Sequence, residues 1–337
     1  MYKVSFSGDP YKAGYKYGDI SYKRNTRIID KIEVSEEDYS LGEKNINIYK
    51  EYYPEILVEI KGLAEGQKLI YEELASFIFS SPSLNHDDKS FCFAICDENN
   101  IILGRNENII GGSNGLHKNC FYNLHGGYSF IGNTASLVQM GDGVNEWGLS
   151  IGLSPISSKL SKPGFNGGML VRYLLEKCKS TYEALEMVKA LPIGSRQGLL
   201  IVDILGDGLL LECSSEKVCE VTFDLNEPIL LSANIFNSQA MRRHRSKGAE
   251  GILLKDRYEQ LKSILRRDKE NPQEFPFKFL TETQDFMSEF SKDKKYETLW
   301  SSIYDLKKRK IYRCEGNLQK NKYKEDYRLR ALYNSIR

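Results

Sequence analysis

The chain has 337 residues, with 47 lysines and arginines against 46 aspartates and glutamates. This length allows one large domain or two modest ones, and the balanced charge gives no overall field that would attract nucleic acid or an anionic membrane. No apolar run reaches the roughly 20 residues of a membrane-spanning helix, and residues 1–6 lack the basic and then apolar order of a signal peptide. We therefore expect a cytoplasmic protein that binds neither membrane nor nucleic acid.

Cysteine and histidine usage argues against a metal or disulfide framework. Seven cysteines are scattered without CxxC pairs, and the four histidines show no ligand spacing. The glycine-rich segment 111–115 lacks the Gly-Lys-Ser/Thr ending of a phosphate-binding loop. We therefore expect reduced thiols, no metal and no cofactor.

Residues 1–89 are predicted to form a helical leader or pro-segment. Gly14 and Gly18 punctuate an early helix, apolar residues three and four apart continue from about 42 to 66, and a short helix covers 71–79. The polar segment 80–88, which contains a proline, is the clearest break in the chain. Residues 90–337 are expected to form the main domain.

From residue 90 the pattern changes to strands. Residues 90–96 and 101–106 predict a hairpin closed by the turn formers at 97–100. Helices are predicted at 169–178, 181–191 and 250–267, with 320–337 a possible C-terminal helical extension, and 142–148 is predicted to be a turn. The mixed order predicts an α+β layered fold rather than a Rossmann alternation. Further strands are predicted at 128–132, 136–140, 149–153, 199–204, 209–213, 218–223, 229–233, 299–306 and 310–314.

The predicted hairpin brings a small nucleophile close to an arginine. Ser90 and Cys92 open its first strand, and Arg105 closes the second. All four histidines lie in predicted loops, so a histidine base is hard to assemble. If the chain is cut before Ser90 or Cys92, however, the new α-amine, with a pKa of about 7.7 to 8, can act as base for its own side chain.

The same residues also have plain structural interpretations. Free cysteine is among the most buried residue types, so Cys92 also fits a core position, and Arg105 fits a solvated strand end. In the predicted helix 250–267, Arg257 fits a solvated helix face beside Arg266 and Arg267. A conventional cysteine protease that pairs Cys92 with His125 is a further alternative.

Taken in order, these segments resemble the penicillin acyltransferase-like family of N-terminal nucleophile (Ntn) hydrolases, which is related to choloylglycine hydrolases and acid ceramidase. The start of that family's mature chain is similar to Ser-Phe-Cys-Phe-Ala-Ile followed by Gly104-Arg105-Asn106. The resemblance implies an αββα four-layer sandwich, in which two stacked sheets lie between helical layers. Other similar segments are 8–18, 60–66, 145–149, 232–236, 256–258 and 298–303.

The resemblance implies the catalytic roles. Either Ser90 or Cys92 would be the nucleophile: sequence register favours Ser90, and intrinsic reactivity favours Cys92. Arg105 would hold the surroundings of the nucleophile, and Asn234 would stabilise the oxyanion.

The resemblance also implies a substrate-binding set of Asn108, Ser154 and Arg257, two of which depart from the family pattern. Asn108 stands where the pattern Gly-Arg-Asn-x-Asp has an aspartate, so it cannot supply a negative charge to hold the α-amine. Ser154 stands where choloylglycine hydrolases have asparagine, and its hydroxyl has a shorter reach.

The implied function is that of a self-processing amidohydrolase or acyltransferase. It would act through an acyl-enzyme on a small-molecule amide or acyl donor, either a linear non-peptide amide or a thioester. The sequence leaves open whether the protein forms a homo-oligomer. The departures at Asn108 and Ser154 support an alternative, a degenerate member that binds a small acylated ligand or partner without chemistry.

Overall fold

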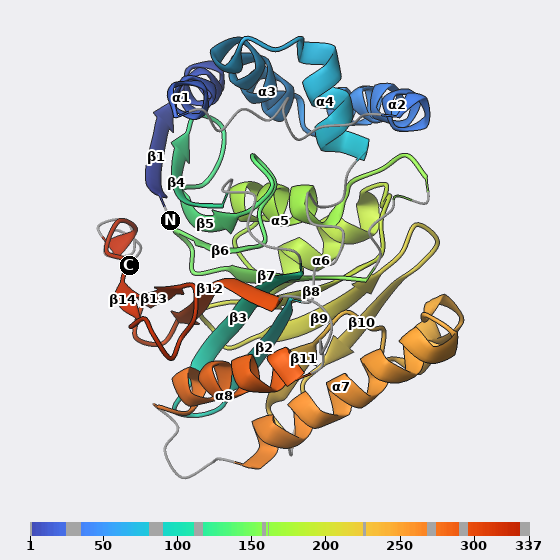
Figure 1. The fold of residues 1–337 in the computed structure, drawn as a ribbon, viewed down its shortest axis with the longest axis vertical. Coiled ribbons are helices and arrows are strands. Elements are labelled where there is room, and N and C mark those ends of the chain that lie inside the picture. The colour runs from blue at the N-terminus through green and yellow to red at the C-terminus, as the bar shows by residue number, and fades with distance from the viewer. Residues whose placement is uncertain are drawn as a thin grey trace.

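The computed structural model describes residues 2–24, 35–80, 90–110, 117–156, 160, 162–224, 227–267, 274–289 and 296–330. Two β-sheets are stacked face to face, and helices cover both outer faces (Figure 1). The predicted α+β fold, a four-layer αββα sandwich, is therefore confirmed.

The larger sheet has the strand order β1-β4-β5-β6-β7-β8-β9-β10. Neighbouring strands are antiparallel, except that β1 runs parallel to β4. The strands are β1 (Tyr2–Gly8), β4 (Lys118–Leu124), β5 (Phe130–Thr134), β6 (Asp142–Asn145), β7 (Ser150–Pro155), β8 (Gln197–Val202), β9 (Gly208–Cys213) and β10 (Val218–Thr222).

The smaller sheet is antiparallel throughout, with the order β11-β2-β3-β12-β13-β14. The predicted hairpin is confirmed as β2 and β3, because Phe91 pairs with Asn106 and Cys96 with Ile101. The strands are β2 (Phe91–Cys96), β3 (Ile101–Ile110), β11 (Ile229–Ser232), β12 (Tyr296–Asp305), β13 (Lys310–Glu315) and β14 (Lys324–Glu325).

The helices form the two outer layers. Helices α7 and α8 cover the smaller sheet, and α5 and α6 cover the larger sheet. Helices α1 to α4 lie on the same side as α5 and α6, with α1 packed on β1 (Figure 1). Their bounds are α1 (Pro10–Lys23), α2 (Glu36–Tyr52), α3 (Pro54–Gln67), α4 (Tyr71–Ser80), α5 (Gly167–Lys177), α6 (Thr181–Ala190), α7 (Gly248–Arg267) and α8 (Phe275–Glu289), with a 3-10 helix at Gln239–His244.

Strand β2 shows how the sequence builds these layers. Successive side chains of a strand point to opposite faces of its sheet. Phe91 and Phe93 therefore pack under α7 and α8, whereas Cys92 and Ala94 pack against the larger sheet. The run of apolar residues in β2 is explained by burial of both faces.

The leader differs from its predicted helical pattern in two places. Residues 2–8 form β1, in which Phe6 stacks on Tyr17 of α1 at a ring-centroid distance of 5.3 Å. The helical pattern between 42 and 66 is two helices, because Pro54 lacks an N–H and begins α3 instead of continuing α2. Of the predicted break at 80–88, Ser80 is the last residue of α4, and residues 81–88 lie outside the described residues, as do Lys89 and the glycine-rich segment 111–115.

Three later segments also differ from prediction. Residues 136–140 form a tight turn rather than a strand: Ser136 bridges to Gln139, and Leu137 has φ +61°. Their apolar side chains are buried in this turn, which explains the strand-like pattern. Asp142–Asn145, predicted as a turn, is β6. In the predicted C-terminal helix, Lys324–Glu325 is a short strand, and 331–337 lie outside the described residues.

Glycines bring α1 and α3 into backbone contact. A Cβ atom at Gly14 would lie 1.9 Å from the Glu59 carbonyl oxygen, and one at Gly62 would lie 2.1 Å from the Tyr11 carbonyl oxygen. Only glycine permits this approach, since any side chain would drive the helices apart. The glycines that marked the leader in the sequence therefore fix how its helices pack.

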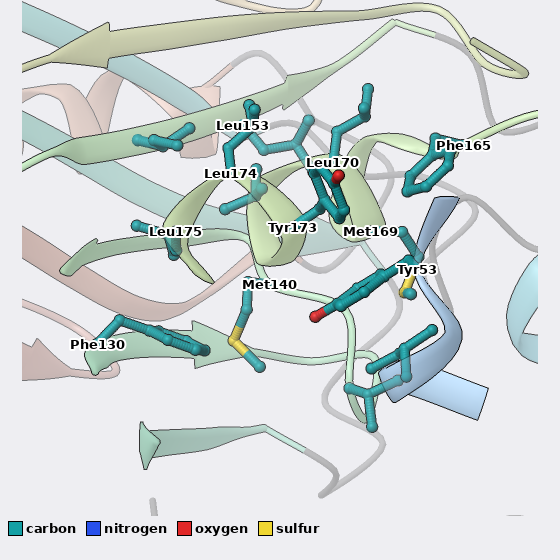
Figure 2. Close-up of a cluster of buried hydrophobic side chains, with 14 of the residues drawn as sticks. Tyr53, Phe130, Met140, Leu153, Phe165, Met169, Leu170, Tyr173, Leu174 and Leu175 are labelled. Carbon is teal, nitrogen blue, oxygen red and sulfur yellow. The ribbon is translucent and has the colours of Figure 1, made fainter. Parts of the chain in front are cut away.

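A buried arginine joins the leader to the body of the protein. Arg172 of α5 pairs through Nη2 with Glu59 of α3 at 2.7 Å and through Nε with Glu176 at 2.6 Å, and its guanidinium lies 3.7 Å from the Tyr122 ring centroid. Nearby, Tyr53 of the leader packs among side chains of α5 that include Tyr173 (Figure 2). We call Glu59, Arg172 and Glu176 the buried triad.

Glu59 is expected to make the stability of the fold depend on pH. Burial raises the pKa of its carboxyl to about 7 from the ordinary 4.5, although the charge of Arg172 lowers it. Because the folded chain then holds this proton more tightly than the unfolded chain, the contribution of Glu59 to stability falls as pH rises through the range 4.5 to 7.

The check is the thermal midpoint of the wild type and of Glu59→Gln at several pH values. The amount by which the thermal midpoint of the wild type exceeds that of Glu59→Gln is expected to shrink between pH 5 and pH 8. The two pKa values of the carboxyl, 4.5 when unfolded and about 7 when folded, set this range. A difference in midpoint that stays constant over this range would contradict the expectation.

Candidate active site

Ser90 lies immediately before β2, at one end of the smaller sheet. It is buried, and its Oγ accepts a hydrogen bond from the backbone N–H of Asn108 at 3.4 Å. The side chain of Asn108 is also held, because its Oδ1 accepts from Thr298 Oγ1 at 2.7 Å. The ends of β2, β3 and β12 therefore meet around Ser90.

Cys92 lies two residues deeper, between the sheets. Its Sγ is 3.6 Å from the Gly152 carbonyl oxygen, and a Cβ atom at Gly152 would lie 3.0 Å from the Cys92 Cβ. Burial raises the pKa of the thiol to about 12, although the charge of Arg105 lowers it. Such a thiol carries negligible thiolate at neutral pH.

Arg105 faces the same inner layer from β3. It pairs with Cys92 in the ladder, and its Nε donates to the Leu153 carbonyl at 2.8 Å. Its Nη1 forms an ion pair with Glu107, and the guanidinium lies 5.8 Å from the Trp300 ring centroid. Arg105 is 1 % exposed, so the interpretation as a solvated strand end is wrong.

Asn106, the neighbour of Arg105, faces the opposite side. Its Nδ2 donates to the Leu280 carbonyl of α8 at 3.1 Å, and its Oδ1 accepts from Ser301. Strand alternation therefore separates the arginine, which faces the site, from an asparagine that anchors α8.

Three residues from distant parts of the sequence form a connected group. The Asn234 N–H donates to Ser154 Oγ at 2.6 Å, and its Nδ2 donates to the Pro155 carbonyl at 2.7 Å. Arg257 Nη1 donates to Asn234 Oδ1 at 2.8 Å. Since arginine can only donate, this contact fixes which end of the Asn234 amide is oxygen.

The local backbone explains why Asn234 turns inward. It has φ +57°, a left-handed conformation that asparagine adopts more readily than most residues, and it lies two residues after the end of β11. Arg257 lies in α7 and is 3 % exposed, so its interpretation as part of a solvated helix face is wrong.

Strand registers place these groups at one margin of the sandwich. Ser232, the last residue of β11, pairs with Cys92, and Asn234 follows β11 by two residues just as Ser90 precedes Cys92 by two. Ser154 lies two residues beyond Gly152, which contacts Cys92 from the larger sheet. Hydrogen bonds and strand registers thus connect all seven residues predicted from the sequence, with Cys92 and Arg105 paired between the sheets.

A small cavity opens beside this group. Its volume is about 20 Å³, room for about one water molecule, and it is lined by charged, polar and apolar side chains. The lining includes Arg105, Glu107, Gln139, Pro155 and Trp300.

His125 is not part of this arrangement. His125 is exposed on the turn after β4, whereas Cys92 is fully buried between the sheets. The predicted alternative of a Cys92–His125 protease is therefore wrong.

The family model for acyl-coenzyme A:6-aminopenicillanic acid acyl-transferase matches residues 96–320. The chain belongs to this family. The resemblance to penicillin acyltransferase-like Ntn hydrolases is therefore confirmed. The match begins after Ser90 and Cys92, so the choice of nucleophile depends on geometry.

Several solved structures of hydrolases are similar to the chain. A mutant conjugated bile acid hydrolase from Clostridium perfringens is 14% identical, with a TM-score of 0.46 and coverage of 70% of this chain and 96% of the other. The Caenorhabditis elegans ortholog of N-acylethanolamine-hydrolyzing acid amidase is 13% identical, with a TM-score of 0.46 and coverage of 65% and 93%. Penicillin V acylase from Agrobacterium tumefaciens is 15% identical, with a TM-score of 0.38 and coverage of 67% and 82%. A search of curated proteins finds no match.

Sequence reasoning missed two members of the site in this acyltransferase-family chain, Glu107 and Trp300. The signal for Glu107 was its position two residues after Arg105, on the same face of the predicted strand. Trp300 showed no such signal, because its contact with Arg105 depends on pairing between β3 and β12.

Within the ranges that the structure describes, no cluster of three histidine, cysteine, aspartate or glutamate side chains is arranged to bind a metal ion. Among the helices described, none is both long enough and apolar enough to span a membrane.

Proposed function

We propose that this family member is a self-processing amidohydrolase or acyltransferase whose nucleophile is Ser90. The observation that supports Ser90 over Cys92 is its position just before β2, where its Oγ accepts from the Asn108 N–H and where the register of β11 points to Asn234. Cys92 instead lies between the sheets, with its Sγ 3.6 Å from the Gly152 carbonyl oxygen. We keep the cytoplasmic location predicted from the scattered cysteines as part of this proposal.

Processing would begin with attack of Ser90 Oγ on the carbonyl carbon of residue 89. The peptide C–N bond breaks, an ester to Oγ forms, and the nitrogen of Ser90 becomes a free amine. Hydrolysis of that ester by water releases residues 1–89 with a new carboxyl group and leaves Ser90 as the first residue of the second fragment.

Turnover would use the new α-amine as general base. The amine takes the proton of Ser90 Oγ as the oxygen attacks the carbonyl of a linear non-peptide amide or a thioester. The proton then passes to the leaving amine or thiol, which leaves an acyl-enzyme. Water gives hydrolysis, and an acceptor amine gives acyl transfer.

Asn234 would stabilise the oxyanion of each tetrahedral intermediate. Its Nδ2 carries two hydrogens, one of which donates to Pro155, and we assign the other to the oxyanion. Arg257 holds the amide in this orientation.

The proposal is tested by the intact mass of the purified protein under denaturing conditions. Cleavage before Ser90 gives fragments 1–89 and 90–337, whereas cleavage before Cys92 gives 1–91 and 92–337. A single species of full length would overturn self-processing. Under native conditions the fragments are expected to stay together, because the buried triad and the β1–β4 pairing join them.

Asn234→Ala is expected to lower kcat for amide hydrolysis by about 10²- to 10³-fold, since it removes one oxyanion donor. Turnover is measured on processed protein, and KM should change less than kcat because the donor acts mainly in the transition state. Asn47→Ala, at an exposed position on α2, is the control and should leave kcat unchanged. Equal kcat values for both variants would contradict the role of Asn234.

The degenerate, ligand-binding alternative is supported by Asn108. Its uncharged side chain is engaged with Thr298, so it supplies no carboxylate to an α-amine. This alternative predicts an uncut chain and no covalent labelling of Ser90 or Cys92 by an amide- or lactam-based electrophile. Stoichiometric labelling of either residue would refute it.

A further inference from the structure

Glu107 lies opposite Ser90 across the hairpin. Phe91 pairs with Asn106 in the antiparallel ladder, so the next step outward places Glu107 across from Ser90. Side chains at opposite positions project from the same face, with Cβ atoms about 4.5–5.5 Å apart. The side chain of Asn108 instead bonds to Thr298. The carboxylate near Ser90 is thus one residue earlier than in the family pattern.

The environment of Glu107 is that of a site residue. It is 4 % exposed, forms an ion pair with Arg105 and lines the cavity beside Trp300 and Pro155. A buried carboxylate is costly unless it is paired, and a buried arginine equally needs a counterion. Each therefore keeps the other in place at the margin where Ser90 lies.

Other buried charges around this pair have their own contacts. Asp142 accepts from Trp300 Nε1 at 3.4 Å and from Ser302 Oγ. Arg313 lies 5.8 Å from the Trp300 ring centroid, and Arg257 binds Asn234. Among the residues of the hairpin, Glu107 is the carboxylate that lies opposite Ser90 and on the same face of the sheet.

We propose that Glu107 is the positioning residue that holds the α-amine of Ser90 and, through the same carboxylate, Arg105. It takes the role that the family resemblance gives to an aspartate at position 108. The inference rests on the proposed function. An N–H of the amine donates to the Glu107 carboxylate, which leaves the nitrogen lone pair directed at Ser90 Oγ.

Removal of this charge has a defined effect on pH dependence. Without Glu107, the positive charge of Arg105 disfavours an ammonium at residue 90, so the pKa of the amine falls. The amine acts when neutral, so kcat/KM declines at low pH, where the amine is protonated. Without Glu107 this decline, the acid limb of the pH profile, moves to lower pH. A merely structural role would lower activity or stability without moving this limb.

The test compares the wild type, Glu107→Gln, Asn108→Asp and the Glu107→Gln/Asn108→Asp double variant, each checked for processing by intact mass. Glu107→Gln is expected to shift the acid limb down by about one pH unit. It should also lower the plateau of kcat/KM on the order of 10- to 100-fold, because the amine and Arg105 lose their positions. The double variant, which restores a carboxylate at the family's position, should move the limb back up and recover part of the rate. Asn108→Asp alone, with two carboxylates, should shift the limb above that of the wild type.

The outcomes separate this inference from the proposed function. An active wild type with an unchanged limb and rate in Glu107→Gln would overturn the role of Glu107 and leave the proposed function intact. An uncut, inactive wild type would overturn both. Should Glu107→Gln not fold, Glu107→Asp decides, because it keeps the charge but shortens its reach: an acid limb below that of the wild type supports the role, and an unchanged limb contradicts it. Glu315→Gln, at an exposed carboxyl of the same sheet, is the control.

Discussion

Ser90→Ala is expected to leave the chain in one piece and to abolish amide hydrolysis. Without the hydroxyl there is no atom to attack either the carbonyl of residue 89 or the substrate. Loss of a catalytic nucleophile lowers kcat on the order of 10⁶-fold where it has been measured in serine hydrolases. The measurements are intact mass and hydrolysis of a chromogenic amide.

Two matched variants make this expectation specific. Ser90→Cys keeps a nucleophile at the same position and should still be cut, since thiols are intrinsically more nucleophilic than hydroxyls. Cys92→Ala should be cut and active, with a stability loss of about 1 kcal/mol from lost packing between the sheets. Cleavage of Ser90→Ala, or an uncut Cys92→Ala, would assign the nucleophile to Cys92.

Arg172→Met is expected to lower the free energy of unfolding by about 3–5 kcal/mol. Removal of one partner from a buried ion pair leaves the opposing charge without compensation, and here two carboxylates, Glu59 and Glu176, lose their shared guanidinium. The loss is measured by urea unfolding followed by circular dichroism.

The control is Lys189→Met, whose ammonium pairs with Glu186 at 3.1 Å with both side chains about half exposed. Exposed pairs contribute little, so this change should stay within about 0.5–1 kcal/mol. Adding Glu59→Gln to Arg172→Met should recover part of the loss, because one stranded charge is removed. Equal stability of Arg172→Met and the wild type would show that the triad does not hold the leader.

The site was predictable from sequence where its geometry is local. Residues 90–96 and 101–106 are apolar segments on either side of a cluster of turn formers, so the pairing of Cys92 with Arg105 follows from a single hairpin. The roles of Asn234 and Arg257 came from family resemblance, and periodicity alone favoured a solvated face for Arg257. Its burial depends on α7 packing over the end of β11, a contact between segments with no local signature.

Other parts of the fold were hidden for similar reasons. Strand β1 exists because β4, more than a hundred residues away, offers an edge to pair with. The turn at 136–140 buries apolar side chains on both sides and so resembles a strand in sequence. In the sequence, Glu107 has the pattern of an ordinary charged residue on a strand. Its place in the site depends on the ion pair with Arg105 and on the cavity that it lines.

The position of β1 has a practical consequence for engineering. Arg328 Nη1 donates to the Val4 carbonyl at 2.9 Å, and Lys3 pairs with Asp326 at 3.5 Å, so the two ends of the described chain are neighbours in space. A peptide that joins residue 330 to residue 2 would therefore permit a circular permutant that opens at Ser90. Such a chain would carry its α-amine at Ser90 once the initiator methionine is removed, and would separate the chemistry of turnover from that of maturation.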